Sequence, residues 1–159
     1  MKLPIFLFVT LAGIGASAYI YAGNQNSVQF RVQVHIKESC NISSQGASNL
    51  DFGTVNRSAD TLSAQGNLNI TCTQGTPYTI ALKSDRKMLN QTTSGAVIPY
   101  TLYQDANQSI VWGFDSNQSY TNTGIGANQN IPVWGKVAKQ DTNVPSGSYS
   151  DTVTAVVSY

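Results

Sequence analysis

The sequence predicts an all-β sandwich with little or no helix. Helical periodicity is missing after residue 22, and short alternating runs of apolar and polar residues recur between clusters of Gly, Pro, Asn and Ser. The roughly 137 residues after that position suit one domain with a useful core. The predicted strands are Val28–Lys37, Leu50–Val55, Asn67–Thr73, Tyr78–Ser84, Ile98–Gln104, Ser109–Gly113, Ile131–Lys139 and Tyr149–Val157.

Residues 1–22 have the layout of a cleavable signal peptide. Lys2 supplies a positive charge, residues 3–14 are almost wholly apolar, and small residues follow. The apolar run is shorter than the roughly 20 residues that a membrane span needs. Cleavage fits after Ala18 or after Ala22, and we assign it after Ala22. We therefore expect the protein to be exported.

The strongest periodic signal in the sequence lies in residues 28–37. All five even positions are apolar and all five odd positions are polar or charged, as in a strand that buries one face. The apolar set is Val28, Phe30, Val32, Val34 and Ile36. The segment lies close to the N-terminus expected after cleavage. The alternative is that it pairs within its own sandwich as an ordinary first strand.

The last predicted strand, Tyr149–Val157, alternates for part of its length and is followed by Ser158 and Tyr159, where the sequence stops. A sandwich whose chain stops at this strand lacks a closing partner for it. We therefore expect an open sheet edge and a groove in the core. Open edges invite pairing with another chain, so proteins cover them or use them.

The two cysteines, Cys40 and Cys72, belong to a chain that we expect in an oxidising compartment. An even pair there predicts a disulfide rather than a metal or redox site. On the loop-entropy model such a bond restricts the unfolded chain by roughly 3.5–4 kcal/mol. A Cys-His metal site fits poorly, because His35 is the only histidine and the two cysteines are far apart in sequence.

The charge balance predicts no strong electrostatic attraction to nucleic acid or to an anionic membrane. Without Lys2 the chain has eight basic and eight acidic side chains and is close to neutral. Asn, Gln, Ser and Thr are abundant. This composition suits a surface that packs against copies of itself, and equally an ordinary extracellular protein.

No catalytic group of residues can be defended. A serine triad would need His35, which lies on the polar face of the alternating segment, and no serine has a nucleophile-elbow motif. The run 124–129 lacks the Lys-Ser/Thr pair of a phosphate-binding loop and predicts a β-turn. The scattered aspartates, which we expect to cap backbone amides, are Asp51, Asp105, Asp115 and Asp151. We therefore expect no enzyme, no cofactor and no bound metal.

The two tryptophans, Trp112 and Trp134, each stand between a valine and a glycine. In a secreted carbohydrate-binding module such residues stack on sugars. In a sandwich they more often pack between the sheets, and we favour that interpretation.

Six Asn-x-Ser/Thr triplets would predict glycosylation in a eukaryotic secreted protein. They begin at Asn41, Asn56, Asn69, Asn90, Asn107 and Asn117. Because so polar a chain produces many such triplets by chance, we assign them no function.

An ordered series of motifs runs through nearly all of the chain after the signal. It comprises Cys40-Asn41-Ile42, Leu50-Asp51-Phe52-Gly53, residues 66–72, 98–106, Val111-Trp112-Gly113, 133–137 and 144–153. Each motif is weak alone, but the order, the cysteine placement and the last strand ending in tyrosine are specific together. The series resembles the spore coat U domain family, which includes the Csu-type subunits of archaic chaperone-usher pili. Trp134 and Lys136 stand where a Tyr and an Arg are expected, and both changes keep the aromatic and the cation.

The resemblance implies a single incomplete immunoglobulin-like β-sandwich over residues 38–159 that lacks its last strand. It also implies that residues 23–37 are a donor strand, whose five even apolar side chains enter the groove of a neighbouring subunit. The expected partners are neighbouring pilus subunits, a periplasmic chaperone and an outer-membrane usher. The expected C-terminal edge strand, which receives the chaperone's strand and later the donor, includes Val153, Val156, Val157 and Tyr159.

The implied function is that of a structural subunit of a surface pilus, in the shaft or as a minor adaptor. A tip adhesin of this family would carry a second, binding domain and no donor strand. The implied route is through the periplasm to the cell surface, where the pilus supports adhesion and biofilm formation. A secreted carbohydrate-binding module and, more remotely, a small secreted hydrolase are the alternatives.

Overall fold

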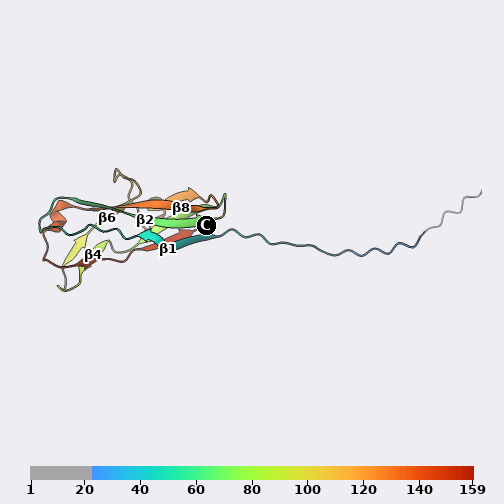
Figure 1. Ribbon diagram of the computed structural model, residues 1–159, viewed down its shortest axis with the longest axis horizontal. Coiled ribbons are helices and arrows are strands. Elements are labelled where there is room, and N and C mark those ends of the chain that lie inside the picture. The colour runs from blue at the N-terminus through green and yellow to red at the C-terminus, as the bar shows by residue number, and fades with distance from the viewer. Residues whose placement is uncertain (1–22) are drawn as a thin grey trace, which may run out of the picture. The chain divides into compact units, whose positions relative to one another are not determined.

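The computed structural model describes residues 23–159, apart from the side chains of residues 43–48 (Figure 1). The chain divides into a unit that ends at His35 and a compact unit, residues 36–159. The predicted signal peptide, residues 1–22, lies outside the described residues. Among the residues described, no helix has the length and apolar character to cross a membrane.

The compact unit is all-β, which confirms the predicted class (Figure 1). Its strands are β1 (Cys40–Ser48), β2 (Leu62–Cys72), β3 (Pro77–Lys83), β4 (Lys87–Asn90), β5 (Val97–Pro99), β6 (Thr101–Tyr103), β7 (Tyr120–Thr123), β8 (Asn128–Val137), β9 (Tyr149–Ser150) and β10 (Thr154–Ser158). The helical elements in the described range are two short 3-10 turns, η1 (Ser116–Gln118) and η2 (Lys139–Thr142).

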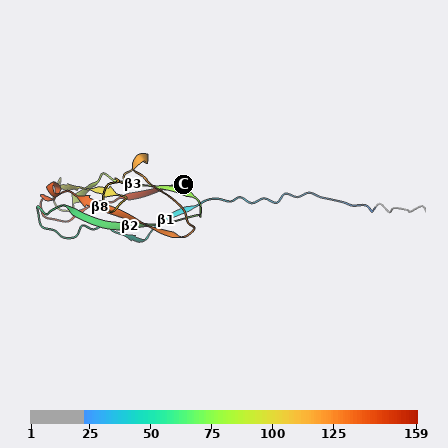
Figure 2. The ribbon, with the colours of Figure 1, turned by 90° about the horizontal axis from the view of Figure 1, so that it is seen from above.

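The strands pair in three antiparallel sheets. A four-stranded sheet has the order β1-β2-β8-β6, and a three-stranded sheet has the order β10-β3-β7. These two sheets form the layers of the sandwich, and β2 and β3 lie in different layers (Figure 2). A smaller sheet, β5-β4-β9, completes the unit.

The core follows from the period of two along each strand, which sends alternate side chains to one face. In β3 the buried residues are Tyr78, Ile80 and Leu82, and in β8 the inward face includes Val133 and Val137. The buried apolar set comprises Ile70, Cys72, Tyr78, Ile80, Leu82, Tyr100, Leu102, Trp112, Ile131, Val133 and Val137. In β3 and β8 the alternation that the sequence displays is therefore the alternation between core and surface.

The predicted disulfide is confirmed. Cys40 and Cys72 are bonded and stand opposite each other in the ladder of β1 and β2. The bond therefore ties the first strand of the four-stranded sheet to its neighbour.

The predicted strand over residues 50–55 is wrong. Leu50 and Phe52 do turn toward the core, where both side chains lie over Gly135 of β8. The chain then turns, because the Gly53 N–H donates to Asp51 Oδ1 at 2.8 Å and Gly53 adopts a φ of 75°. The real strand, β1, lies just before this segment in a polar run without alternation.

Two further predicted strands also differ from the structure. The run 98–104 divides at Tyr100 into β5 and β6, because the Tyr100 N–H donates to the carbonyl of Arg86 at 3.1 Å. The run 109–113 forms only a single bridge, between Val111 and Tyr103. The prediction also missed β4, and it missed β7, which lies in the polar stretch expected to be a loop.

Candidate functional site

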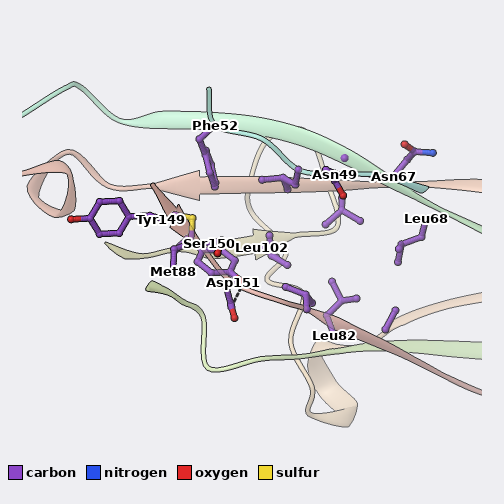
Figure 3. A pocket seen from close by; sticks show the side chains of 16 residues that line it. Asn49, Phe52, Asn67, Leu68, Leu82, Met88, Leu102, Tyr149, Ser150 and Asp151 are labelled. Atoms are coloured by element: carbon purple, nitrogen blue, oxygen red, sulfur yellow. Dashed lines mark hydrogen bonds between the residues drawn. The ribbon is translucent and has the colours of Figure 1, made fainter. Parts of the chain in front are cut away.

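An apolar groove of about 510 Å³ opens between the two main sheets (Figure 3). Side chains from both layers line it, with Leu68 and Leu102 from one sheet and Leu82 and Ala155 from the other. Gly66 of β2 also lines the groove, and a glycine adds depth because it presents no side chain. These residues on the floor of the groove were not predicted as site residues from the sequence, although the alternation within β2 and β3 indicates most of them.

A second cavity of about 580 Å³ adjoins the first. The two share Leu50, Phe52, Met88 and Tyr149 among their lining residues. Loops form the rest of its wall, mainly around residues 53–57 and 144–148. The first cavity thus lies between the sheets, and the second lies next to it among these loops.

Two chain segments border the groove, residues 49–52 after β1 and residues 149–155, which lead into β10. β1 and β10 are the terminal strands of their sheets, so each has one ladder edge without a partner strand among the described residues. An incoming strand could therefore pair with the backbone of the rim while its side chains enter the groove.

Asp151 fixes the conformation of residues 149–155, the second of the two segments that border the groove. Its carboxylate accepts a hydrogen bond from the Tyr100 hydroxyl at 2.6 Å and one from the Thr152 N–H at 2.8 Å. The predicted continuous strand 149–157 is wrong here, because β9 pairs with β4 whereas β10 pairs with β3. Burial, followed by the hydrogen bond to Asp151, raises the pKa of the Tyr100 hydroxyl.

The four residues predicted for the C-terminal edge strand have different environments. Val153 and Val157 are half-buried and pack against the core, as does Ala155 between them. Val156 is on the other face and is 39% exposed, and Tyr159 follows the end of β10 and is 62% exposed. The structure thus places two of the four on the core side of this edge.

The predicted donor segment has no regular secondary structure, since residues 23–39 contain no strand. A strand requires a partner for its backbone groups, and alternation of side chains does not supply one. The five even apolar side chains are the most exposed large hydrophobics of the described chain, at 80–87%. They are Val28, Phe30, Val32, Val34 and Ile36.

Trp112 and Trp134 lie in different environments. Trp112 is fully buried, and its indole N–H donates to the carbonyl of Ile80 at 2.8 Å. Trp134 is half-buried on the face of β8 opposite Val133 and Gly135. The sequence interpretation that these residues pack within the sandwich is therefore correct for Trp112.

The other residues considered as candidate sites either hydrogen-bond to the backbone or have no group of potential ligands around them among the described residues. The Asp105 carboxylate accepts hydrogen bonds from the Ile110 and Ser109 N–H groups, and the bond from Ile110 contributes most to lowering its pKa. Residues 124–127 connect β7 to β8, and the last two residues of the predicted turn, 128 and 129, belong to β8. His35 is exposed, and no group of three or more potential metal ligands occurs in the part of the chain that is described.

Comparison of the sequence with known proteins identifies a family that matches most of the chain. The model of the spore coat protein U domain matches residues 26–156. Protein U of Myxococcus xanthus is 30% identical over 141 residues, which are 76% of this chain and 78% of that protein.

A structural relative comes from the CsuC–CsuE chaperone–tip adhesion subunit pre-assembly complex of the archaic chaperone-usher Csu pili of Acinetobacter baumannii. A chain of this complex matches with a TM-score of 0.54 and 25% identity over 78% of the present chain. The present chain spans 40% of the length of that chain. The all-β sandwich described above is therefore a fold found in this pilus assembly system.

Proposed function

Because the chain belongs to the spore coat protein U domain family, we propose that it is a structural subunit of a chaperone-usher surface pilus. In this proposal residues 23–37 of one copy insert as a donor strand into the groove of another copy. One observation carries the proposal: an apolar groove beside free sheet edges occurs in the same chain as an exposed segment with alternating apolar side chains.

The five apolar side chains of the donor segment supply the driving force. They are 80–87% exposed, so nearly their whole apolar surface is available for burial in another copy. Burying five such groups contributes roughly 7–15 kcal/mol as an upper bound before the cost of ordering the segment. Pairing with the backbone of the groove rim adds to this, as in other cases of strand addition. Assembly of this kind needs no nucleotide hydrolysis.

The proposed partners follow from the same groove. Before assembly, a periplasmic chaperone covers it with a strand of its own, and the matched Csu structure is itself a chaperone–subunit complex. An outer-membrane usher then exchanges that strand for the donor of the next subunit. The subunit is exported to the cell surface as part of a shaft or as a minor adaptor, where the pilus supports adhesion and biofilm formation. We assign it no catalytic role.

The test compares the two faces of the donor segment in the full mature chain. Phe30→Ser, Val32→Ser and Val34→Ser together remove the central apolar side chains. Gln29→Ser and Gln33→Ser alter the other face of the same segment and serve as the control. We expect the unaltered chain and the control to form polymers that dissociate very slowly, as measured by light scattering after size-exclusion chromatography.

The triple variant should form no polymers and should be unstable alone. A synthetic peptide of residues 23–37 should restore a stable monomer, because it fills the groove without carrying a second sandwich. A triple variant that remains a stable monomer without peptide would mean that the sandwich is complete by itself, and the proposal would be wrong.

A further inference from the structure

We propose that Asp51 and Asp151, the two carboxylates on the groove rim, favour donor strands whose outward face is basic. They would then be specificity determinants of assembly. This inference rests on the proposed function, because it concerns which strand enters the groove and how fast.

The charges of the chain are divided between the two partners of the proposed assembly. Residues 23–37 contain Arg31 and Lys37 and no acidic side chain. All eight acidic side chains lie within residues 38–159, together with six basic ones. A donor segment with two net positive charges therefore approaches a sandwich with two net negative charges. Glu38, which directly follows the donor segment, is one of the eight acids.

The alternation of the donor segment decides where its charges go. When the even apolar residues enter a groove, the odd residues face outward along its mouth. Arg31 and Lys37 are both odd, and so is His35. Both cations thus come to lie beside the rim of the neighbour's groove rather than over its apolar floor.

Two exposed carboxylates stand on that rim. Asp151 lines the first cavity and Asp51 lines the second. Asp151 accepts two hydrogen bonds and Asp51 accepts one, from the Gly53 N–H, so both keep free lone pairs for a cation. Their own contacts hold the carboxylates in place before a donor arrives.

The basic side chains near the groove have other partners. Among the described residues, Arg57 is the one cation that lines either cavity, and its Nε donates to Asn143 Oδ1 at 2.8 Å. The Arg86 guanidinium lies near the Tyr100 ring, but it donates to the carbonyls of Leu82 and Trp112 and does not line the groove. In the part of the chain that the structure describes, Asp151 is therefore the single charged residue that lines the first cavity.

Exposed ion pairs of this kind add little to the final stability of a complex. They raise the association rate and disfavour partners with the wrong charge, and salt screens both effects. The expected signature is thus a preference among competing donor strands that disappears at high salt.

A competition between two peptides measures this preference directly. The full mature chain is unfolded and refolded with equal excesses of two residue 23–37 peptides, one unaltered and one carrying Arg31→Gln and Lys37→Gln. The peptides differ in mass, so mass spectrometry of the captured monomer gives their ratio. Because both compete for the same folded grooves, the ratio does not depend on how much of the chain refolds. Slow dissociation makes it a ratio of association rates.

We expect the unaltered peptide to be captured about 3–10 times more often at low salt, and about equally at roughly 0.5 M NaCl. Asp51→Asn with Asp151→Asn in the acceptor should bring the low-salt ratio to about one. Asp115→Asn, the same change of charge at an exposed carboxylate away from the groove, should leave the preference intact.

Equal capture of both peptides at low salt would overturn this inference while leaving donor-strand assembly in place. Capture of neither peptide would overturn the proposed function itself. A preference that persists in the Asp51→Asn, Asp151→Asn acceptor would assign the selection to other charges and would also refute the role of the rim.

Discussion

The two sides of the sandwich are closed in different ways. On the side of β6 and β7, Trp112 joins the two layers: its backbone N–H donates to the Leu102 carbonyl in one sheet, and its indole N–H donates to the Ile80 carbonyl in the other. The next residue continues into the second sheet, where the Gly113 carbonyl accepts from the Leu82 N–H. This side is sealed by a chain segment that passes from one layer to the other.

On the side of β1 and β10, no described segment passes between the layers in this way. Leu50 and Phe52 reach inward from one rim, and Val153 and Ala155 from the other, with the groove between them. These rim residues are half-buried, whereas Trp112 and Ile80 are fully buried. From this difference we expect the Trp112 side to contribute more packing energy to the unit and, under the proposed function, the open side to receive the donor strand.

Trp112→Ala should have the largest effect on stability, because it removes the residue that joins the layers. Loss of a buried Trp costs about 3–5 kcal/mol, and the Ile80 carbonyl also loses its partner. Trp134→Ala is the matched control on the outer face of β8, where we expect a loss of at most about 1 kcal/mol. Guanidinium unfolding of the peptide-capped monomers measures both. Equal losses would contradict the assignment of Trp112 to the sealed side.

Replacing both Cys40 and Cys72 by Ala should destabilise the open side, because it removes the covalent bond between β1 and β2. The loop-entropy model gives a loss of about 3.5–4 kcal/mol for a loop of this length. Because β1 is a terminal strand bonded to β2, its pairing should be the first structure lost. Hydrogen exchange should show faster exchange in β1 than in β3. Uniformly faster exchange would indicate that the bond acts on the whole unit instead.

The central strands β3 and β8 were the easiest part of the fold to predict from the sequence. Residues 78–84 and 131–139 alternate clearly, and both correspond to strands in the structure with ends shifted by one to three residues. Their buried faces carry large β-branched and aromatic side chains, so the local pattern and the tertiary burial agree. The disulfide was also predictable, because it depends on the compartment and the cysteine count.

The open side was harder to predict, because its structure depends on contacts rather than on local pattern. Leu50 and Phe52 alternate like a strand, but they cover Gly135, which is remote in sequence. β1 is polar, and only its pairing with β2 and the disulfide make it a strand. The break at Asp151 depends on Tyr100, 51 residues away. Two features of the sequence pointed to this side of the molecule: the alternating segment 28–37 and the last predicted strand, 149–157.

Leu50→Ala should separate binding from stability on the open side. Leu50 lines both cavities, so its truncation removes apolar contact with an inserted strand. We expect a loss of about 1–2 kcal/mol in stability, because the side chain is only half-buried, and at least about tenfold slower capture of the 23–37 peptide. Leu89→Ala, at a residue that is 57% exposed and lines neither cavity, should change neither quantity. An equal effect of the two changes would mean that the groove does not receive the strand.

Tyr100→Phe should have the smallest effect, and one that depends on pH. The hydroxyl donates to Asp151 at the groove rim, so its loss should cost about 0.5–1.5 kcal/mol at neutral pH. The pKa of Tyr100 is raised in the folded protein, so this group contributes stability that is fully present below about pH 10 and lost as pH rises through the folded pKa. The advantage of the unaltered protein over the variant should therefore shrink above about pH 10, as measured by urea unfolding at several pH values. Tyr159→Phe, at an exposed tyrosine, controls for the loss of a hydroxyl and should not change stability at neutral pH. If the difference in unfolding free energy between the two proteins stays constant across this pH range, the hydrogen bond that the Tyr100 hydroxyl donates to Asp151 does not stabilise the protein.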